Sequence, residues 1–252
     1  MSASIDNVIM ISDGSDDEHS GDERFTIVAA SDGSPTDVLL EVWSPPRVAP
    51  EYRRLHQGCA ISLDLTTGWD SSDLGDRKKL LDFVNLIQPH RIILSPPCTM
   101  FSTLQNANRG KVPSAIFAAR LDNALQMLTF AMLLARLVKN YGGGFVFEHP
   151  RSATSWSYPV VRLVMALPNV HIADFDQCRY GLRTPDGSAL LRKSTRFLTN
   201  IPGVVREFHG TTCSCAAGTH GRIQGSQNGV QISSHAARYP AGLVQALVGA
   251  IT

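Results

Sequence analysis

Short apolar runs alternate with longer segments of helical periodicity from Phe25 to Thr252. The short runs predict buried strands over residues 38–42, 59–65, 91–94, 145–148, 170–175 and 195–199. The periodic segments predict helices over residues 51–56, 76–88, 114–140, 156–167 and 240–251. This alternation is typical of an open, mostly parallel α/β sheet, which we expect to form one domain over residues 25–252.

Several predicted strands end in residues with reactive or ligand-binding side chains. Glu41, Asp64, Cys98 and Glu148 each fall at such an end. In open α/β sheets, ligands bind outside the carboxyl ends of the strands. We therefore expect one crevice to collect all four side chains.

The composition fits an intracellular protein, located in the nucleus if the source is eukaryotic. Of the 252 residues, 43% are hydrophobic and 18% are charged, which excludes wholesale disorder. Five cysteines at irregular spacing argue against a disulfide framework. The uncharged run inside the long predicted helix covers only residues 123–135, which is too short to cross a membrane, so no membrane partner is expected.

The charge is divided unevenly along the chain. Residues 1–24 predict a disordered acidic tail. The first 25 residues hold seven acids against Arg24 alone, so the formal charge of +1 leaves +7 on the remainder. A basic body favours a polyanionic partner such as nucleic acid. The apolar island at residues 8–11, followed by acids, resembles a SUMO-interacting motif that would add a strand to its partner; a plain solvated tail is the alternative.

One cysteine lies in an unusual loop after the third predicted strand. Pro96 and Pro97 hold Cys98 on a rigid, non-helical turn, because proline fixes its own backbone and donates no N–H. Such a mount suits a nucleophile, provided that a nearby base or positive charge forms the thiolate. The alternative is a small apolar residue packed under a loop.

The string Pro-Pro-Cys-x-x-Phe-Ser at residues 96–102 resembles the catalytic loop of the cytosine-C5 methyltransferases. Glu148, at a strand end 50 residues beyond Cys98, resembles the start of the family's Glu-Asn-Val element, although His149 and Pro150 replace Asn and Val. The short motifs at residues 41–47 and 62–70, together with the Pro-Pro-Cys loop, also resemble the divergent methyltransferase-like domains of mobile-element polyproteins. The family's Arg-x-Arg element corresponds to Lys193 and Thr195, so this match is partial.

The resemblance implies a Rossmann-like, S-adenosylmethionine-dependent methyltransferase fold and methyl transfer to C5 of cytosine, in DNA rather than RNA. The Cys98 thiolate would add to C6, Glu148 would contact N3, and Lys193 and Thr195 would orient the base or contact phosphate. A base inside a duplex is out of reach, so the target would be flipped out or single-stranded. The implied nucleic-acid contacts are Ser102, Arg109, Lys111 and Arg196.

The cofactor side of the resemblance is weaker. The family has Phe-x-Gly-x-Gly after its first strand, whereas this chain has Trp-Ser-Pro-Pro at residues 43–46, and the prolines restrict the turn. Asp64 is placed to accept ribose hydroxyls or, by its distance from Cys98, to contact adenine, and Asp70 is a second candidate. Ordinary turn and capping chemistry is the alternative for both acids. The expected S-adenosylmethionine contacts are Glu41, Trp43, Ser44, Pro45, Asp64, Leu65, Asp70 and Pro96.

Only 52 residues follow Asn200, so a separate target-recognition domain is expected to be small or absent. Two other functions stay open. The first is another pyrimidine-C5-modifying enzyme whose cysteine adds to C6, for instance with a folate donor. The second is a catalytically degenerate adaptor that binds nucleic acid or SUMO.

Residues 209–220 gather four potential metal ligands, which are His209, Cys213, Cys215 and His220. Zinc takes cysteine and histidine in tetrahedral sites, and a metal would staple a loop that has few apolar residues. The Cys-x-Cys spacing departs from the usual Cys-x2-Cys, and a surface loop with incidental thiols is the alternative.

Overall fold

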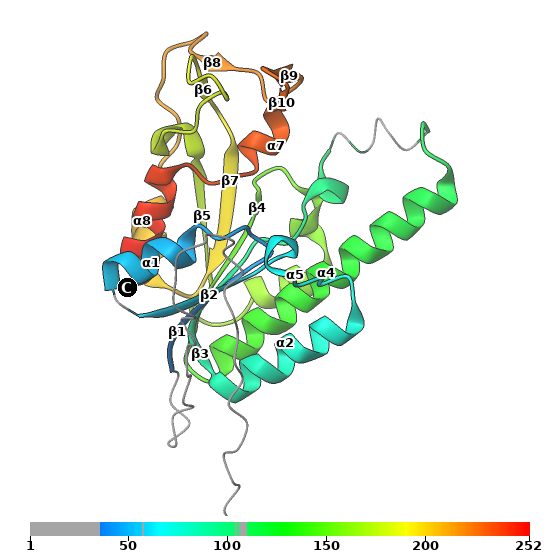
Figure 1. Ribbon diagram of the computed structural model, residues 1–252, viewed down its shortest axis with the longest axis vertical. Helices are drawn as coiled ribbons and strands as arrows, with labels where there is room; N and C mark the ends of the chain where they lie inside the picture. The colour runs from blue at the N-terminus through cyan, green and yellow to red at the C-terminus, as the bar shows by residue number, and fades with distance from the viewer. Residues whose placement is uncertain (1–35, 57, 104, 106–109) are drawn as a thin grey trace, which may run out of the picture.

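The computed structural model describes residues 36–56, 58–103, 105 and 110–252 (Figure 1). The predicted acidic tail, the SUMO-like island and Arg109 lie outside the described residues.

Six strands form one mixed sheet in the order β2-β1-β3-β4-β7-β5. The strands are β1 Thr36–Val42, β2 Cys59–Leu63, β3 Pro89–Leu94, β4 Gly144–Pro150, β5 His171–Asp176 and β7 Ser194–Thr199. Strands β2, β1, β3 and β4 pair in parallel, whereas β7 lies antiparallel between β4 and β5. The predicted α/β class with a mostly parallel sheet is confirmed, and the topology is compatible with a Rossmann-like fold.

Helices cover both faces of the sheet, giving three layers (Figure 1). One face carries α1 Val48–His56, α6 Pro202–Phe208 and α8 Ala241–Ile251. The other face carries α2 Leu74–Ile87, α4 Ser114–Asn140 and α5 Pro159–Met165. Neighbouring strand residues point to opposite faces, so Leu40 and Ile92 pack under the second group while Leu39 and Ile93 pack under the first.

Within the described part of the chain, α4 is the one helix long and apolar enough, by length and composition, to cross a membrane. It packs against β3, β4, α2 and α5, and Leu128, Met132 and Ala135 on it are fully buried. Half of its most apolar 18-residue window is buried inside the protein. The N-terminal turns of α4 project beyond the sheet (Figure 1), and Ile116 there is 47% exposed.

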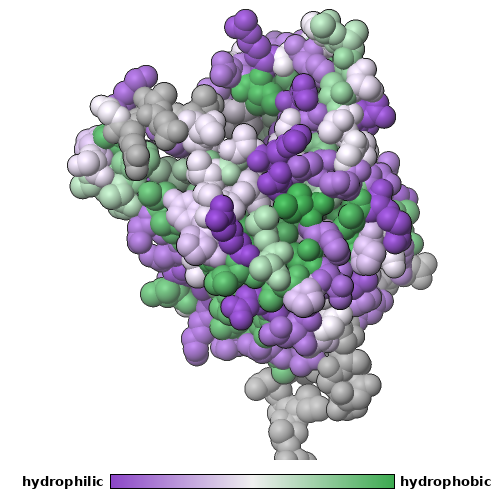
Figure 2. All heavy atoms as spheres, turned by 180° about the vertical axis from the view of Figure 1, so that it is seen from behind, coloured by the Kyte–Doolittle hydropathy of each residue, from purple (hydrophilic) through white to green (hydrophobic). Residues whose placement is uncertain are grey.

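A small unit of short elements extends from the β5–β7 edge (Figure 1). It contains η4 Gln177–Tyr180, β6 Leu190–Leu191, β8 His220–Gly221, β9 Ser226–Gln227, β10 Val230–Gln231 and α7 Ile232–Ala236. Its buried apolar cluster is small and consists of Leu182, Leu191 and Ala236. The reverse face of the molecule shows hydrophobic patches between hydrophilic side chains (Figure 2).

Candidate active site

The carboxyl ends of β1 and β3 form a topological switch point. From β1 the chain runs to β2 on one side of β1, and then to β3 on the other side. Val42 at the end of β1 is in register with Leu63 and Leu94, and Leu94 is in register with Phe147. Ligands of open α/β sheets bind at such an edge. The four strand ends therefore lie along one edge of the sheet, although neither hollow described below is lined by Glu41, Asp64, Cys98 or Glu148.

Glu41 caps helix α1 from inside the protein. It is fully buried, and its Oε2 accepts hydrogen bonds from the backbone N–H groups of Arg47 (3.1 Å), Val48 (3.0 Å) and Ala49 (3.0 Å). Ser62 Oγ donates a fourth bond at 3.0 Å. Burial raises the pKa of Glu41, and these bonds oppose the rise. Oε2 of Glu41 is thus a structural cap, whereas its buried Oε1 has no hydrogen-bond partner in the described structure.

The turn after β1 is built around Trp43. Its φ of 61° is left-handed, which is rare for a bulky residue, and its backbone N–H donates to Leu63 O at 3.0 Å. The indole packs edge-on against Phe130, with ring centroids 6.1 Å apart, and its buried Nε1 has no hydrogen-bond partner among the described residues. Ser44 Oγ donates to the carbonyl of the exposed Pro45 at 3.2 Å. Tryptophan here adopts the conformation that glycine would adopt without strain.

Turn and capping chemistry accounts for both acids near β2. Asp64 caps the 3-10 turn η1 Leu65–Thr67, where its Oδ1 accepts from Thr66 N at 3.0 Å and Thr66 Oγ1 at 2.9 Å. Asp70 accepts from the backbone and hydroxyl of Ser72. Leu65 is 70% exposed. Asp64 nevertheless stands half-buried at the end of β2, beside the turn that follows β1.

His149 holds the loop that carries Cys98. It is fully buried; its Nε2 lies 3.1 Å from Pro96 O, and its Nδ1 lies 2.7 Å from Ser155 Oγ. A carbonyl oxygen only accepts, so Nε2 carries the proton, and Ser155 donates to Nδ1. Burial lowers the pKa of His149 to about 4, so the ring is neutral at neutral pH. His149 therefore fixes Pro96, two positions before Cys98.

Cys98, Glu148 and Lys193 bring a thiol, a carboxylate and an ammonium group together at this edge of the sheet. Cys98 is half-buried just before η2 Thr99–Phe101. Burial raises the pKa of its thiol, the charge of Glu148 raises it further, and Lys193 lowers it. Lys193 Nζ lies 3.7 Å from Glu148 Oε1, and that buried oxygen has no hydrogen-bond partner in the described structure. A protonated thiol, a buried carboxyl group and a cation thus lie close enough to influence one another.

Tyr239, which comes just before the closing helix, also belongs to this site. Its hydroxyl lies 3.1 Å from Ser95 Oγ, and its carbonyl accepts from Arg47 Nη1 at 3.5 Å. Burial raises the pKa of Tyr239 well above its ordinary value, and the charge of Glu148 adds to the rise. The only sequence signal is its position directly before Pro240, which precedes the closing helix.

Two residues expected to contact substrate have structural partners instead. Thr195 is fully buried, where it accepts from Gln177 Nε2 at 2.9 Å, so it supports the strand end. Arg196 forms two hydrogen bonds with Asp174, at 2.6 and 2.8 Å, and its guanidinium lies 5.3 Å from the centre of the Trp156 ring.

The other two expected nucleic-acid contacts that the structure describes lie near the Cys98 loop. Ser102 follows η2 and is half-buried, whereas Lys111 is exposed shortly before α4.

Two hollows flank the Cys98 and Trp43 loops. One of about 360 Å³ lies between the Cys98 loop and α4, and it is lined by residues that include Pro97, Thr99 and Arg120. The other, of about 410 Å³, lies between the starts of α1 and α8, and Arg47 and Tyr239 are among the residues lining it. Both have the size of small-molecule sites.

The predicted metal-ligand set is corrected at one position. Cys213, Cys215 and His220 lie together with Cys178, whereas His209 is exposed at the end of α6 and belongs to no such group. The ligand atoms of the four clustered residues all lie within 4.8 Å of one another.

No protein-family model matches the chain, and no curated protein is significantly similar to it in sequence. The geometry of the site is therefore the basis for inferring its function.

Proposed function

We propose that the protein transfers a methyl group from S-adenosylmethionine to C5 of cytosine in nucleic acid, with DNA favoured, and that Cys98 is the nucleophile. One observation carries the proposal. The buried Oε1 of Glu148, at the end of the strand next to the one that leads to Cys98, faces the Lys193 ammonium group at 3.7 Å but accepts no hydrogen bond in the described structure. A buried acceptor without a partner is costly in a folded protein, which supports a role in binding a ligand.

The chemistry assigns a role to each member of the group. The Glu148 carboxylate would take the thiol proton of Cys98 and deliver it to N3 of cytosine, which neutralises the negative charge that attack of the Cys98 sulfur on C6 places on the ring. Lys193 favours the thiolate, because it lowers the pKa of Cys98. Loss of the C5 proton to water after methylation then breaks the bond between sulfur and C6 and restores both the ring and the cysteine.

The residues at the carboxyl ends of β1 and β2 suit the nucleoside part of the cofactor better than its amino-acid part. Asp64 stands at the end of β2, where an acid suits ribose hydroxyls, and Trp43 in the neighbouring turn has a buried indole N–H with no partner among the described residues. Pro45 and Pro46 offer no N–H groups for a carboxylate. When bound, S-adenosylmethionine would supply an electrophilic methyl group.

The charge of the segment around the site supports a polyanionic substrate. Residues 177–240, which contribute Lys193 and Tyr239, contain eight lysines and arginines against two acids. Positive charge on this scale attracts phosphate backbones and makes binding depend on salt. The target cytosine would be single-stranded or flipped out of a duplex to reach a half-buried thiol.

Trapping with a 5-fluorocytosine oligonucleotide tests the mechanism. The C5 fluorine cannot leave as a proton does, so a covalent complex should accumulate when the wild-type protein is mixed with S-adenosylmethionine and this oligonucleotide. Cys98→Ala should form no complex and transfer no methyl group while keeping the wild-type circular dichroism spectrum. Cys59→Ala, which alters a half-buried cysteine of β2, is the matched control and should behave like the wild type. Normal methylation by Cys98→Ala would refute the mechanism.

A degenerate adaptor that binds nucleic acid is the second candidate, and the turn after β1 favours it. Glu41 is committed to helix α1, and prolines replace the donors that would hold the cofactor. Calorimetric titration of the folded protein with S-adenosylmethionine and S-adenosylhomocysteine separates the two candidates. Saturable binding supports the methyltransferase, whereas binding of oligonucleotides but of neither cofactor supports the adaptor.

A further inference from the structure

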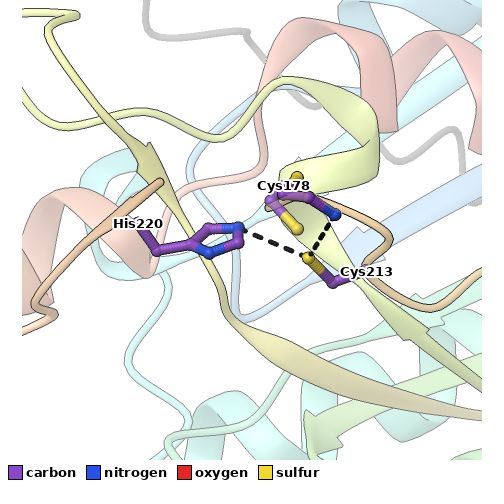
Figure 3. Close-up of side chains that lie close together, drawn as sticks. Cys178, Cys213 and His220 are labelled. Atoms are coloured by element: carbon purple, nitrogen blue, oxygen red, sulfur yellow. Dashed lines mark hydrogen bonds between the residues drawn. The ribbon is translucent and has the colours of Figure 1, made fainter. Parts of the chain in front are cut away.

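Four sulfur and nitrogen ligands converge in the small unit beside the sheet. Cys178 comes from η4, Cys213 and Cys215 come from the loop after α6, and His220 opens β8. In Figure 3, the sulfurs of Cys178 and Cys213 and the ring of His220 face a common point. The four ligand atoms lie within 4.8 Å of one another, and Cys213 Sγ lies 3.4 Å from His220 Nε2.

These separations suit a tetrahedral metal ion. Zinc binds sulfur at ~2.3 Å and imidazole nitrogen at ~2.0 Å, so two ligands of a regular tetrahedron are separated by roughly 3.5 to 3.8 Å. We propose that Cys178, Cys213, Cys215 and His220 bind one structural zinc ion. Three thiolates and one imidazole favour zinc over magnesium or calcium, which prefer oxygen ligands. Four protein ligands leave no open position for substrate, so the role is structural.

The surroundings of the four ligands support a zinc–thiolate centre. The backbone N–H of Cys215 donates to Cys213 Sγ at 3.4 Å, and the backbone N–H of Cys213 donates to Asp176 Oδ2 at 2.8 Å. Two arginines flank the loop. Arg192 pairs with Asp176 at 3.3 Å, and Arg179 donates to the hydroxyl of Ser214 at 2.7 Å. Three thiolates with a zinc ion carry one net negative charge, which these guanidinium groups offset.

A metal ion would stabilise the fold of the small unit beside the sheet, which has little apolar core of its own. Its buried apolar cluster consists of Leu182, Leu191 and Ala236, and β6 and β8 have two residues each. Small units without a sizeable core use metals or disulfides for stability. The same segment leads through α7 to Tyr239, whose hydroxyl contacts Ser95. Zinc would therefore also brace one wall of the candidate active site.

Metal analysis of the intact chain tests the proposal directly. The tag-free protein, purified with a non-thiol reductant, should contain one zinc ion per chain. After chelation, added cobalt should produce a visible spectrum typical of tetrahedral cobalt with thiolate ligands. Chelation should also expose residues 209–240 to protease before the sheet is cut.

Two variants distinguish the proposed ligand set from the one that the sequence spacing predicts. Cys178→Ser should lose zinc, and His209→Ala, the matched control, should keep it. The proposal is overturned if the folded, reduced wild type contains no zinc and binds no cobalt. It is also overturned if Cys178→Ser keeps its metal while His209→Ala loses it, or if two of the cysteines form a disulfide in a metal-free protein.

Discussion

The buried imidazole of His149 makes the stability of this fold depend on pH by an amount that follows from its pKa. In the unfolded chain the ring takes up a proton near the ordinary value of 6.5, whereas in the folded protein burial lowers the pKa to about 4. Between these values the unfolded state binds more protons, so the free energy of unfolding falls as the pH falls. The loss is ~1.4 kcal/mol per pH unit, or about 3 kcal/mol in all, and it is absent above the unfolded pKa.

Urea unfolding of the wild type and of His149→Phe, from about pH 7.5 down to about pH 4, measures this contribution. Phenylalanine keeps the ring contacts with Phe101 and Phe147. It leaves Pro96 O and Ser155 Oγ without a partner, which costs about 1–3 kcal/mol for each group at every pH. The variant should therefore be less stable at neutral pH, and the gap to the wild type should narrow by about 3 kcal/mol in acid.

The control for this comparison is His171→Asn, which removes an exposed imidazole from β5. Its curve should run parallel to that of the wild type. If the gap between the wild type and His149→Phe stays constant over the whole range, His149 is not the buried, neutral hydrogen-bond donor described here. The assignment of its proton to Nε2 would then fall as well.

Glu41→Ala removes the acceptor of three backbone N–H groups and one hydroxyl, so it should lower the free energy of unfolding in urea by about 2–4 kcal/mol, and Glu41→Gln should cost less. Glu148→Gln should speed alkylation of Cys98 by iodoacetamide at neutral pH, and Lys193→Met should slow it, because Glu148 raises and Lys193 lowers the pKa of the thiol. Mass spectrometry of the Cys98 peptide measures both rates. Rates equal to that of the wild type would contradict the electrostatic influence of these two residues on Cys98. The hydrogen bonds from Arg196 lower the pKa of Asp174, so the stability that Asp174 adds is present at neutral pH and lost in acid; the gap in urea midpoint between wild type and Asp174→Asn should close as the pH falls through the folded pKa.

The sequence predicts most of the sheet, because its buried strands are short apolar runs bounded by proline, glycine or charge. The predicted strand at 59–65 ends at Leu63, since Asp64 turns to cap η1, and the predicted helix at 156–167 begins only at Pro159. The direction of β7 could not be predicted, because strand direction depends on how the chain returns from the small unit between β5 and β7. Helix α6 was missed because its seven residues give too short a pattern.

In the candidate site too, contacts between residues far apart along the chain could not be predicted from the sequence. Strand ends locate Cys98 and Glu148, because parallel strands bring their carboxyl ends to one edge. Thr195 and Arg196 sit at strand positions that look equally suitable, yet Gln177 and Asp174 bind them. These partners lie about 20 residues away along the chain, and no local spacing reveals them.

The turn after β1 determines which polar groups a cofactor could contact at this end of the sheet. A glycine-rich turn exposes backbone N–H groups to a ligand. Here Glu41 instead binds the N–H groups at the start of α1, and the prolines at residues 45 and 46 offer none. A cofactor that approaches β1 would therefore meet the half-buried Asp64, whereas the indole N–H of Trp43 is buried and would have to be uncovered before it could donate. A methyltransferase with this turn must bind S-adenosylmethionine mainly through side chains. Substituting Trp43 or Asp64 should therefore weaken cofactor binding far more than a change to the backbone of the intervening segment.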